Sequence, residues 1–440
     1  MDERTRVELA DRTLAHAGSD RLEVLVSSHH SALTRFTQNA IHQNVDASNL
    51  TVRVRAVRAN RTGVATTNRT DDAGLRAVVA QAQSLSDVAP PSDRAPLFLG
   101  PQTYPAVHAA STAPTGPDER AAVARAMFDV AESSGYWAAG FVSTAAHGMT
   151  LATTAGLRAS FDATDSGANV KMNGADATGF AERYAIDAAA LDGRALAKRA
   201  AEKVRAGVAP IAVDPGPWTV ILEPAAFGEL IAYVTDHFSA QAYAEGSSFL
   251  TGSLGKPVFG ENVTIRDDYA HPLNPGQPFD FEGTPTQRLA LVERGVATSI
   301  VTDTRYAREL HCPNTGHALP APNAYGPQPR SVVVDAGTKS TQQLIAETKR
   351  GILVTRLWYV RTVDQRATIV TGMTRDGTFL IENGRIVGGV RNMRFNQSIA
   401  EMLNDCELGS EQVRTGGYAY SLVAPAVKVG RFTFSSTTAF

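Results

Sequence analysis

The 440-residue chain changes character at residues 207–217, and this change limits the folds that it can adopt. Before this segment, stretches with helical periodicity alternate with stretches that have the pattern of strands. After it, glycines separate many short apolar runs, which is typical of a barrel or sandwich of short strands. Because Gly and Pro gather where domains are joined, the sequence predicts an N-terminal domain of residues 1–212 and a C-terminal domain of residues 213–440.

The N-terminal half combines helices with strands. Residues 3–18 repeat apolar side chains at helical spacing, whereas residues 48–57 alternate apolar and polar side chains as a half-buried strand does. Asp71 and Asp72 indicate a helix start, because a short carboxylate caps free backbone N–H groups. We therefore expect an α+β protein whose N-terminal domain is an α/β unit with a mixed sheet and helices.

Two further stretches complete this half. Prolines recur through residues 87–117, which favours a long loop because proline interrupts regular backbone hydrogen bonding. Helices are predicted at 118–134 and 190–206. Between them the pattern predicts several short strands, at residues 137–143, 151–154, 159–163 and 168–172.

The C-terminal half is predicted to be β-rich and barrel-like. It opens with an apolar strand at 218–222, followed by one helical pattern over 224–244. Short helices are expected at 340–349 and 398–404, and the remaining residues have the glycine-punctuated pattern of short strands.

Composition argues against several classes of partner. Hydrophobic residues make up 43% of the chain, enough for a real core, and the formal net charge is -2. No Lys/Arg-rich block is present, so we expect no nucleic-acid partner. No run of about 18 apolar residues indicates a membrane span. The charged N-terminus does not resemble a signal peptide, and the two distant cysteines, Cys312 and Cys406, suggest reduced thiols, so a cytoplasmic location is expected.

A series of segments in fixed order resembles the C-terminal domain of the TldD/PmbA (TldE) family. The N-terminal half agrees more loosely, and the resemblance covers about residues 20–430. The segments that carry it are EGSSFL at 245–250, GxLGKPV at 252–258, VTIRDD at 263–268, FDFEG at 279–283, TG at 315–316, GILVT at 351–355, TGMTRDG at 371–377 and FLIENGRI at 379–386.

This resemblance implies a peptidase with two kinds of subunit. The TldD branch is similar to a zinc peptidase and carries H-E-x-x-x-H on the helix after the first C-terminal strand, with a cysteine near the C-terminus. The TldE branch lacks these residues and pairs with TldD. In this chain the corresponding helix, at 227–245, contains no His-Glu pair, and residues 415–420, near the expected cysteine, contain none. We therefore expect the TldE-like branch, with no catalytic and no metal-ligating residues.

Ligand chemistry supports that expectation independently. Hydrolytic zinc needs about three protein ligands and a nearby base. The helix offers one histidine, His237, with Asp236 before it, and Glu229 and Glu245 are each eight residues from His237. Asp236 and His237 are interpreted as a polar pair rather than half of a catalytic site, because adjacent helix residues point to different faces.

A second polar segment, HCPNTGH at 311–317, could be interpreted as a Cys/His nucleophile pair or a metal cluster, and we favour a structural loop. The GMTRDG segment at 372–377 is interpreted as a tight hairpin connection because Asp-Gly favours such turns. Contacts with the substrate cavity or a partner are expected from Asp236, His237, His317, Asn323 and Arg375.

The function predicted from this sequence is that of a non-catalytic subunit in a heteromeric TldD/TldE-type metallopeptidase. It would complete the cavity in which a TldD-like, zinc-carrying partner hydrolyses a peptide or peptide-like amide, and natural-product tailoring is a second setting for that reaction. Two alternatives stay open: a stand-alone hydrolase that uses His237 or the 311–317 loop, and a purely regulatory binding module.

Overall fold

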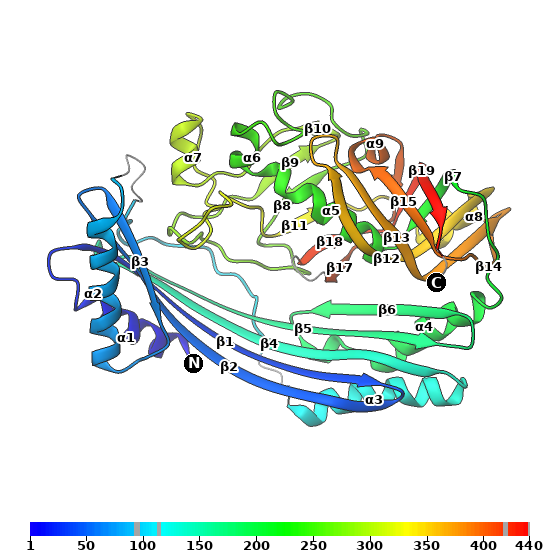
Figure 1. Ribbon diagram of the computed structural model, residues 1–440, viewed down its shortest axis with the longest axis horizontal. Coiled ribbons are helices and arrows are strands. Elements are labelled where there is room, and N and C mark those ends of the chain that lie inside the picture. Colours follow the sequence, from blue (N-terminus) through cyan, green and yellow to red (C-terminus); the bar gives the residue numbers. More distant parts are fainter. Residues whose placement is uncertain (92–96, 112–115, 417–420, 439–440) are drawn as a thin grey trace.

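The structure is a computed structural model that describes residues 1–91, 97–111, 116–416 and 421–438. It has two layers: a long curved N-terminal sheet, and a C-terminal part packed above one face of that sheet (Figure 1). The predicted α+β class is confirmed. No helix among the described residues combines the length and apolarity that a membrane span requires.

The N-terminal sheet has six strands in the order β3-β2-β1-β4-β5-β6. Every pairing in it is antiparallel, so the prediction of a mixed sheet was wrong. Short turns connect the strands within residues 21–67 and within residues 137–185, whereas two helices and the proline-rich loop lie between these two runs. Antiparallel neighbours joined by short turns need no crossover helix. The strands are β1 (Arg21–Thr37), β2 (Ala40–Arg58), β3 (Arg61–Thr67), β4 (Trp137–Thr153), β5 (Arg158–Asn173) and β6 (Thr178–Ala185).

Two of these strands replace the four short ones predicted between 136 and 190. β4 and β5 run unbroken for 17 and 16 residues. Gly148 does not end β4, because the side chain of Arg6 lies where a Cβ of residue 148 would be and fills that space. A tight turn at Gln38 and Asn39, both with positive φ, joins β1 to β2.

Helices cover the face of this sheet that points away from the C-terminal part. Leu22 and Val24 of β1 pack against the first two helices, and Val142 and Val170 pack against the other two. These helices are α1 (Glu3–Leu14), α2 (Asp72–Val88), α3 (Pro117–Ser133) and α4 (Gly193–Ala206). Residues 97–111 form no helix or strand, as predicted for the proline-rich loop, of which residues 92–96 and 112–115 lie outside the described residues.

The C-terminal part contains a closed ring of five strands, which confirms the barrel-like prediction. β12 pairs with β7, β7 with β19, β19 with β15, β15 with β13, and β13 again with β12. β14 and β16 extend the sheet outside the ring. The strands are β7 (Gly216–Leu222), β12 (Arg350–Asp364), β13 (Ile369–Glu382), β14 (Arg385–Gly389), β15 (Met393–Ser398), β16 (Cys406–Leu408) and β19 (Val427–Thr437).

A second six-stranded sheet and short helices complete this part. The sheet follows the order β10-β9-β8-β11-β18-β17, with β8 (Ile265–Asp267), β9 (Leu289–Glu293), β10 (Val296–Ala297), β11 (Val332–Val334), β17 (Val413–Gly416) and β18 (Ser421–Ala424). The helical segments are α5 (Pro224–Thr235), η2 (Asp236–Phe238), α6 (Ala240–Ala244), α7 (Thr304–Glu309), α8 (Thr341–Ala346) and α9 (Ile399–Asn404). The predicted domain boundary at residue 212 falls in the connection between α4 and β7.

Several contacts join the two parts of the molecule, and three of them lie at successive points along the sheet. Near one end of the sheet, Leu25 and Leu151 pack on Phe279 of the C-terminal part. Farther along, an ion pair of 3.1 Å links Arg414 to Asp165. At the other end, Lys171 and Thr178 of the sheet contact Asp376 of β13. A cavity lies between the last two contacts.

Candidate functional site

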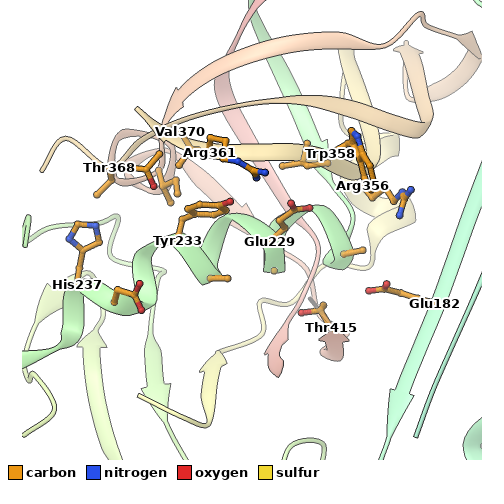
Figure 2. A pocket seen from close by; sticks show the side chains of 18 of the residues that line it. Glu182, Glu229, Tyr233, His237, Arg356, Trp358, Arg361, Thr368, Val370 and Thr415 are labelled. Carbon is orange, nitrogen blue, oxygen red and sulfur yellow. The ribbon is translucent and has the colours of Figure 1, made fainter. Parts of the chain in front are cut away.

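A cavity of about 620 Å³ lies where β6 of the N-terminal sheet meets α5, η2, β12 and β17. This volume is within the range of small-molecule and peptide pockets. Its walls combine aromatic side chains with acidic and basic groups (Figure 2). Its principal polar and aromatic lining residues are Phe180, Glu182, Glu229, Tyr233, Asp236, His237, Arg356, Trp358, Arg361 and Thr415.

Helix α5 forms one wall because it is amphipathic. Pro224 occupies its first turn, where a missing N–H costs nothing. Phe227, Leu230 and Ile231 are buried in the core, whereas residues 225, 228, 229, 232, 233 and 236 recur at three- and four-residue spacing and line the cavity. The helical periodicity of the sequence therefore decides which side chains the cavity receives.

Gly228 sets the distance between α5 and β17. A Cβ at this position would collide with the side chain of Thr415, so glycine lets β17 approach the helix closely. Thr415 and Gly416 then reach the cavity. The remaining residues of the segment where the TldD-type cysteine is expected, 417–420, lie outside the described residues.

Two carboxyl groups dominate the electrostatics of the cavity. Burial raises the pKa of Glu182 to about 7, because Arg356 and the backbone N–H of Gly416 only partly offset the loss of water. Burial also raises the pKa of Glu229, against the attraction of Arg356 and Arg361. Figure 2 shows Glu229 rising from α5, and Glu182 entering from the N-terminal sheet. Neither carboxyl forms an ion pair with a basic side chain within the described part of the chain.

The two basic groups of the cavity are occupied by other contacts. Arg356 donates to Asp376 at 2.8 Å and stacks on the ring of Phe180 at 4.2 Å. Arg361 donates to the carbonyl of Val360 at 2.6 Å and lies 4.4 Å from the ring centre of Tyr359. Among the described residues, neither arginine forms an ion pair with Glu182 or Glu229, although both attract Glu229 electrostatically.

Asp236 and His237 both line this cavity. The single helical pattern predicted over 224–244 was wrong in one respect: the helix stops at Thr235, a 3₁₀ turn follows, and α6 starts at Ala240. This 3₁₀ turn changes the direction of the side chains, so neighbouring residues 236 and 237 reach the same space. Asp236 also borders a second cavity of about 460 Å³ next to Gln328 and Arg330.

His237 is almost fully enclosed, with 3% of its surface exposed. Its Nδ1 accepts a hydrogen bond from the N–H of Phe249 at 3.3 Å. An imidazole that accepts at Nδ1 carries its proton at Nε2 when neutral, and burial lowers the pKa of His237 to about 4. The ring is therefore neutral and carries its proton at Nε2.

The other predicted contact residues lie elsewhere. His317 is fully buried, where its Nδ1 lies 2.9 Å from the Thr315 hydroxyl and its Nε2 lies 3.6 Å from Asp267. Asn323 stabilises its own loop, since it accepts from the N–H of Tyr325 and donates to the carbonyl of Gly326. Neither residue lines the 620 Å³ cavity.

Arg375 lies beside the cavity, stacked on Trp358 at 4.7 Å. The hairpin predicted at GMTRDG was wrong, because these residues lie inside β13. Asp376 and Gly377 have positive φ at a bulge opposite Val354 and Arg356. The bulge turns the Asp376 carboxylate toward Arg356, Lys171 and Thr178.

The 311–317 loop does not assemble a reactive site. Burial raises the pKa of the Cys312 thiol, which disfavours the thiolate that a nucleophile needs. Within the described residues, no three His, Cys, Asp or Glu side chains are grouped as a metal site requires.

Sequence reasoning did not assign roles to Glu182, Tyr233, Arg356 and Trp358. Tyr233 and Glu229 follow the helical spacing of His237, so the periodicity of α5 could have identified them. Glu182 and Arg356 come from strands far apart in the sequence, and only the folded arrangement brings them together.

Comparison with known families identifies the fold and the lineage. The family model described as PmbA/TldA metallopeptidase C-terminal domain matches residues 215–436, and that for PmbA/TldA metallopeptidase domain 1 matches residues 22–86. The chain belongs to the PmbA/TldD family.

Two curated relatives in this family are a metalloprotease of Methanothermobacter thermautotrophicus and the metalloprotease PmbA of Escherichia coli O157:H7. The first is 25% identical over 51% of this chain and 48% of its own length. The second is 27% identical over 46% of this chain and 42% of its own length. The matched segments thus span less than half of these PmbA/TldD relatives.

Two solved structures share the PmbA/TldD fold over nearly the whole chain. TldE from Thermococcus kodakarensis superimposes with a TM-score of 0.88 at 20% identity, covering 98% of this chain and 99% of its own. A Thermotoga maritima protein described as a putative modulator of a DNA gyrase superimposes with a TM-score of 0.86 at 20% identity, covering 98% and 100%. At this identity the likeness shows the fold.

Proposed function

We propose that this chain is the non-catalytic, TldE-like subunit of a two-subunit zinc peptidase. In that assembly it completes the cavity in which a TldD-like partner hydrolyses a peptide or peptide-like amide. Family membership supports the reaction class, because the curated relatives are named metalloproteases. The free thiols of Cys312 and Cys406 fit a reducing compartment, so we place the pair in the cytoplasm.

The observation that carries the proposal is the cavity wall made by α5. By resemblance, the zinc-binding branch has H-E-x-x-x-H on this helix. Here the helix and its 3₁₀ extension present Glu229, Tyr233, Asp236 and His237 to the cavity. A cavity of substrate size adjoins this helix, and the side chains that the helix presents differ from H-E-x-x-x-H.

The residues present do not fit a catalytic zinc ion. Such a site takes about three protein ligands and one open position. His237 uses one ring nitrogen for the N–H of Phe249. Glu229 is eight residues away, with the end of α5 and a 3₁₀ turn between them. Zinc and the base that activates water would therefore belong to the TldD-like partner.

Elemental analysis and co-purification test this proposal together. The chain expressed alone should contain far less than one zinc per molecule and should leave an unfolded peptide uncut. Co-expressed with a TldD-like chain that carries H-E-x-x-x-H, it should co-purify, and the pair should contain zinc and hydrolyse the peptide. The partner's motif Glu changed to Gln should stop hydrolysis without separating the chains.

Two results would contradict the proposal. Near-stoichiometric zinc in the chain alone, lost in His237→Ala, would mean that this cavity binds the metal itself. A stable homodimer that never associates with a TldD-like chain would favour the regulatory module instead.

A further inference from the structure

The second cavity, of about 460 Å³, has a largely apolar wall and is separate in its chemistry from the acidic one. Its volume is within the range of small-molecule pockets. The wall is built from the end of α5, from β11, from β18 and from the loop of residues 319–330. Its apolar lining residues are Leu319, Tyr325, Pro329, Val332 and Leu422. Such a wall accommodates an apolar group, and the polar atoms among these side chains decide which class of ligand the cavity takes.

Two polar side chains of this wall have hydrogen-bonding atoms that no described residue uses. Gln328 donates from Nε2 to the carbonyl of Tyr325 at 3.0 Å, which leaves Oε1 as its acceptor, and this oxygen is buried without a donor. Arg330 donates from Nη2 to the carbonyl of Phe279 and to the hydroxyl of Thr286, each at 3.2 Å, but its Nε is buried without an acceptor. A buried polar atom without a partner costs free energy comparable to a lost hydrogen bond. The wall therefore lacks one donor and one acceptor.

The hydroxyl groups of the wall already have partners. Thr235 donates to the carbonyl of Ile231 at 3.1 Å. Ser421 accepts from Nε of Arg414 at 2.5 Å and donates to Asn274 at 3.1 Å. These hydroxyls add no further requirement that a ligand must meet.

The charges around the cavity favour a neutral ligand. Asp267 and Asp280 attract the guanidinium of Arg330 from behind the wall, and Asp267 also accepts from the backbone N–H of Arg330 at 2.6 Å. Asp236 lines the same cavity. An anion would meet the repulsion of these carboxyl groups, and a cation would meet that of Arg330. A neutral group avoids both.

An amide is the neutral group that meets both unmet requirements. A secondary amide has an acceptor on its carbonyl oxygen and a donor on its nitrogen, whereas an ester has the acceptor alone. Gln328 and Arg330 lie on either side of Pro329, so two separate ligand atoms suit them better than a single hydroxyl.

We propose that this cavity binds a secondary amide attached to an apolar group. The amide carbonyl accepts from Nε–H of Arg330, the amide N–H donates to Oε1 of Gln328, and the apolar group packs on Tyr325 and Leu422. The preference for an amide rests on the cavity alone. Its interpretation as an apolar residue of a peptide substrate rests on the proposed function above, and it would make this cavity the pocket that selects that residue.

Ligand-observed NMR titration of the purified chain tests the proposal without any partner. The probes are N-benzylacetamide and benzyl acetate, which share the ring and the carbonyl, but only the amide has an N–H. We expect the amide to bind about ten-fold more tightly, because the ester leaves Oε1 of Gln328 without a donor. Phenylacetate, which is anionic, should bind more weakly than the amide.

Two variants and a control locate the binding in this cavity. Gln328→Met removes the acceptor at a similar side-chain length, so the amide should bind no more tightly than the ester. Tyr325→Ala shortens a wall residue that is 75% exposed, so both probes should weaken by a similar factor while the ten-fold preference remains. Gln81→Met, at an exposed position of α2, is the matched control and should keep both affinities. Circular dichroism checks that each variant is folded.

Four outcomes would overturn the proposal: equal binding of amide and ester by the unaltered chain, no binding of either, tighter binding of phenylacetate than of the amide, or a preference that survives in Gln328→Met. Failure of zinc-dependent hydrolysis in the co-purified pair would contradict the proposed function and leave the amide preference intact, because the titration needs neither zinc nor partner.

Discussion

Two groups of buried charges lie close together in this molecule, and only one of them is balanced. Asp376 accepts from Arg356, Lys171 and Thr178, so its carboxylate is paired on several sides across the junction of the two parts. Glu182 and Glu229 line the adjoining cavity without an ion pair among the described residues. Breaking a paired buried charge strongly destabilises a fold, whereas a buried carboxyl without an ion pair has a raised pKa and can hold a proton instead.

The ionisation behaviour of the two groups differs accordingly. Burial opposes the ionisation of Asp376, but Arg356 and Lys171 outweigh that effect and hold its pKa below the ordinary range. For Glu182 burial prevails and raises the pKa to about 7. The two carboxyls thus shift in opposite directions, because Asp376 is bonded directly to Arg356, Lys171 and Thr178, whereas Arg356 and Lys203 attract Glu182 without a hydrogen bond to it.

Substituting Asp376, which is paired with Arg356 and Lys171, should have the largest effect on the free energy of unfolding. Asp376→Asn keeps the shape of the side chain and tolerates the positive φ of 53° at this position, but it removes the counter-charge of Arg356 and Lys171. We expect a loss of about 3 kcal/mol in the free energy of unfolding, as for other broken buried pairs. Urea denaturation measures this, with the exposed pair member Glu8→Gln as the control that should change little.

A loss in Asp376→Asn no larger than in Glu8→Gln would show that the junction does not depend on this network. The claim that the paired charges around Asp376 stabilise the fold would then be wrong.

Substituting Glu182, one of the carboxyls without an ion pair, should change the free energy of unfolding by less, and the change should depend on pH. The folded pKa of Glu182, about 7, exceeds the ordinary glutamate value of 4.5, so the folded state holds the proton more tightly than the unfolded chain. Stability from this group is present below pH 4.5 and is lost as the pH rises toward 7. Glu182→Gln should abolish this loss and be more stable than the unaltered chain at pH 8, by roughly 2 kcal/mol.

The measurement is a series of urea denaturations from pH 5 to pH 8 for both proteins. Parallel curves for the two proteins across this range would mean that Glu182 titrates normally, and the inferred charge imbalance of the cavity would be wrong.

Arg356 acts on both groups of charges, and substituting it should give the smallest of the expected effects, a shift in the pKa of the glutamates. Arg356 lowers the pKa of Glu182 and of Glu229 while it binds Asp376. Arg356→Met keeps a long apolar stem against Phe180 and should raise the pKa of both glutamates further. Carboxyl ¹³C NMR titration would detect this upward shift. An unchanged or lower pKa in the variant would show that Arg356 does not act on the cavity.

The sequence predicted the helices better than the long strands. Each helix has local signals, such as the Asp71 cap of α2, whose carboxylate accepts from the N–H of Gly74. The length of β4 and β5 has no local signal, because Gly148 stays in the strand through a contact with Arg6, far away in the sequence. Closure of the five-stranded ring likewise depends on pairings between distant segments.

The candidate site was predicted in part for the same reason. Asp236 and His237 were named from the helix, and both line the cavity. Glu182 was missed, because a single glutamate on a strand has no pattern that separates it from a solvated one. The bulge at Asp376 was mistaken for a hairpin, since Asp-Gly with positive φ serves both purposes.

The position of β19 in the ring has a consequence for the order of folding during synthesis. Val427–Thr437 lies between β7 and β15, and Trp218 of β7 pairs with Phe432. β7 leaves the ribosome long before its neighbour is made, so the ring must wait for residues near the end of the chain. The N-terminal hairpin of β1 and β2 has its partners next to each other and can form much earlier. During that interval the unpaired edge of β7 is the segment that a molecular chaperone would need to protect.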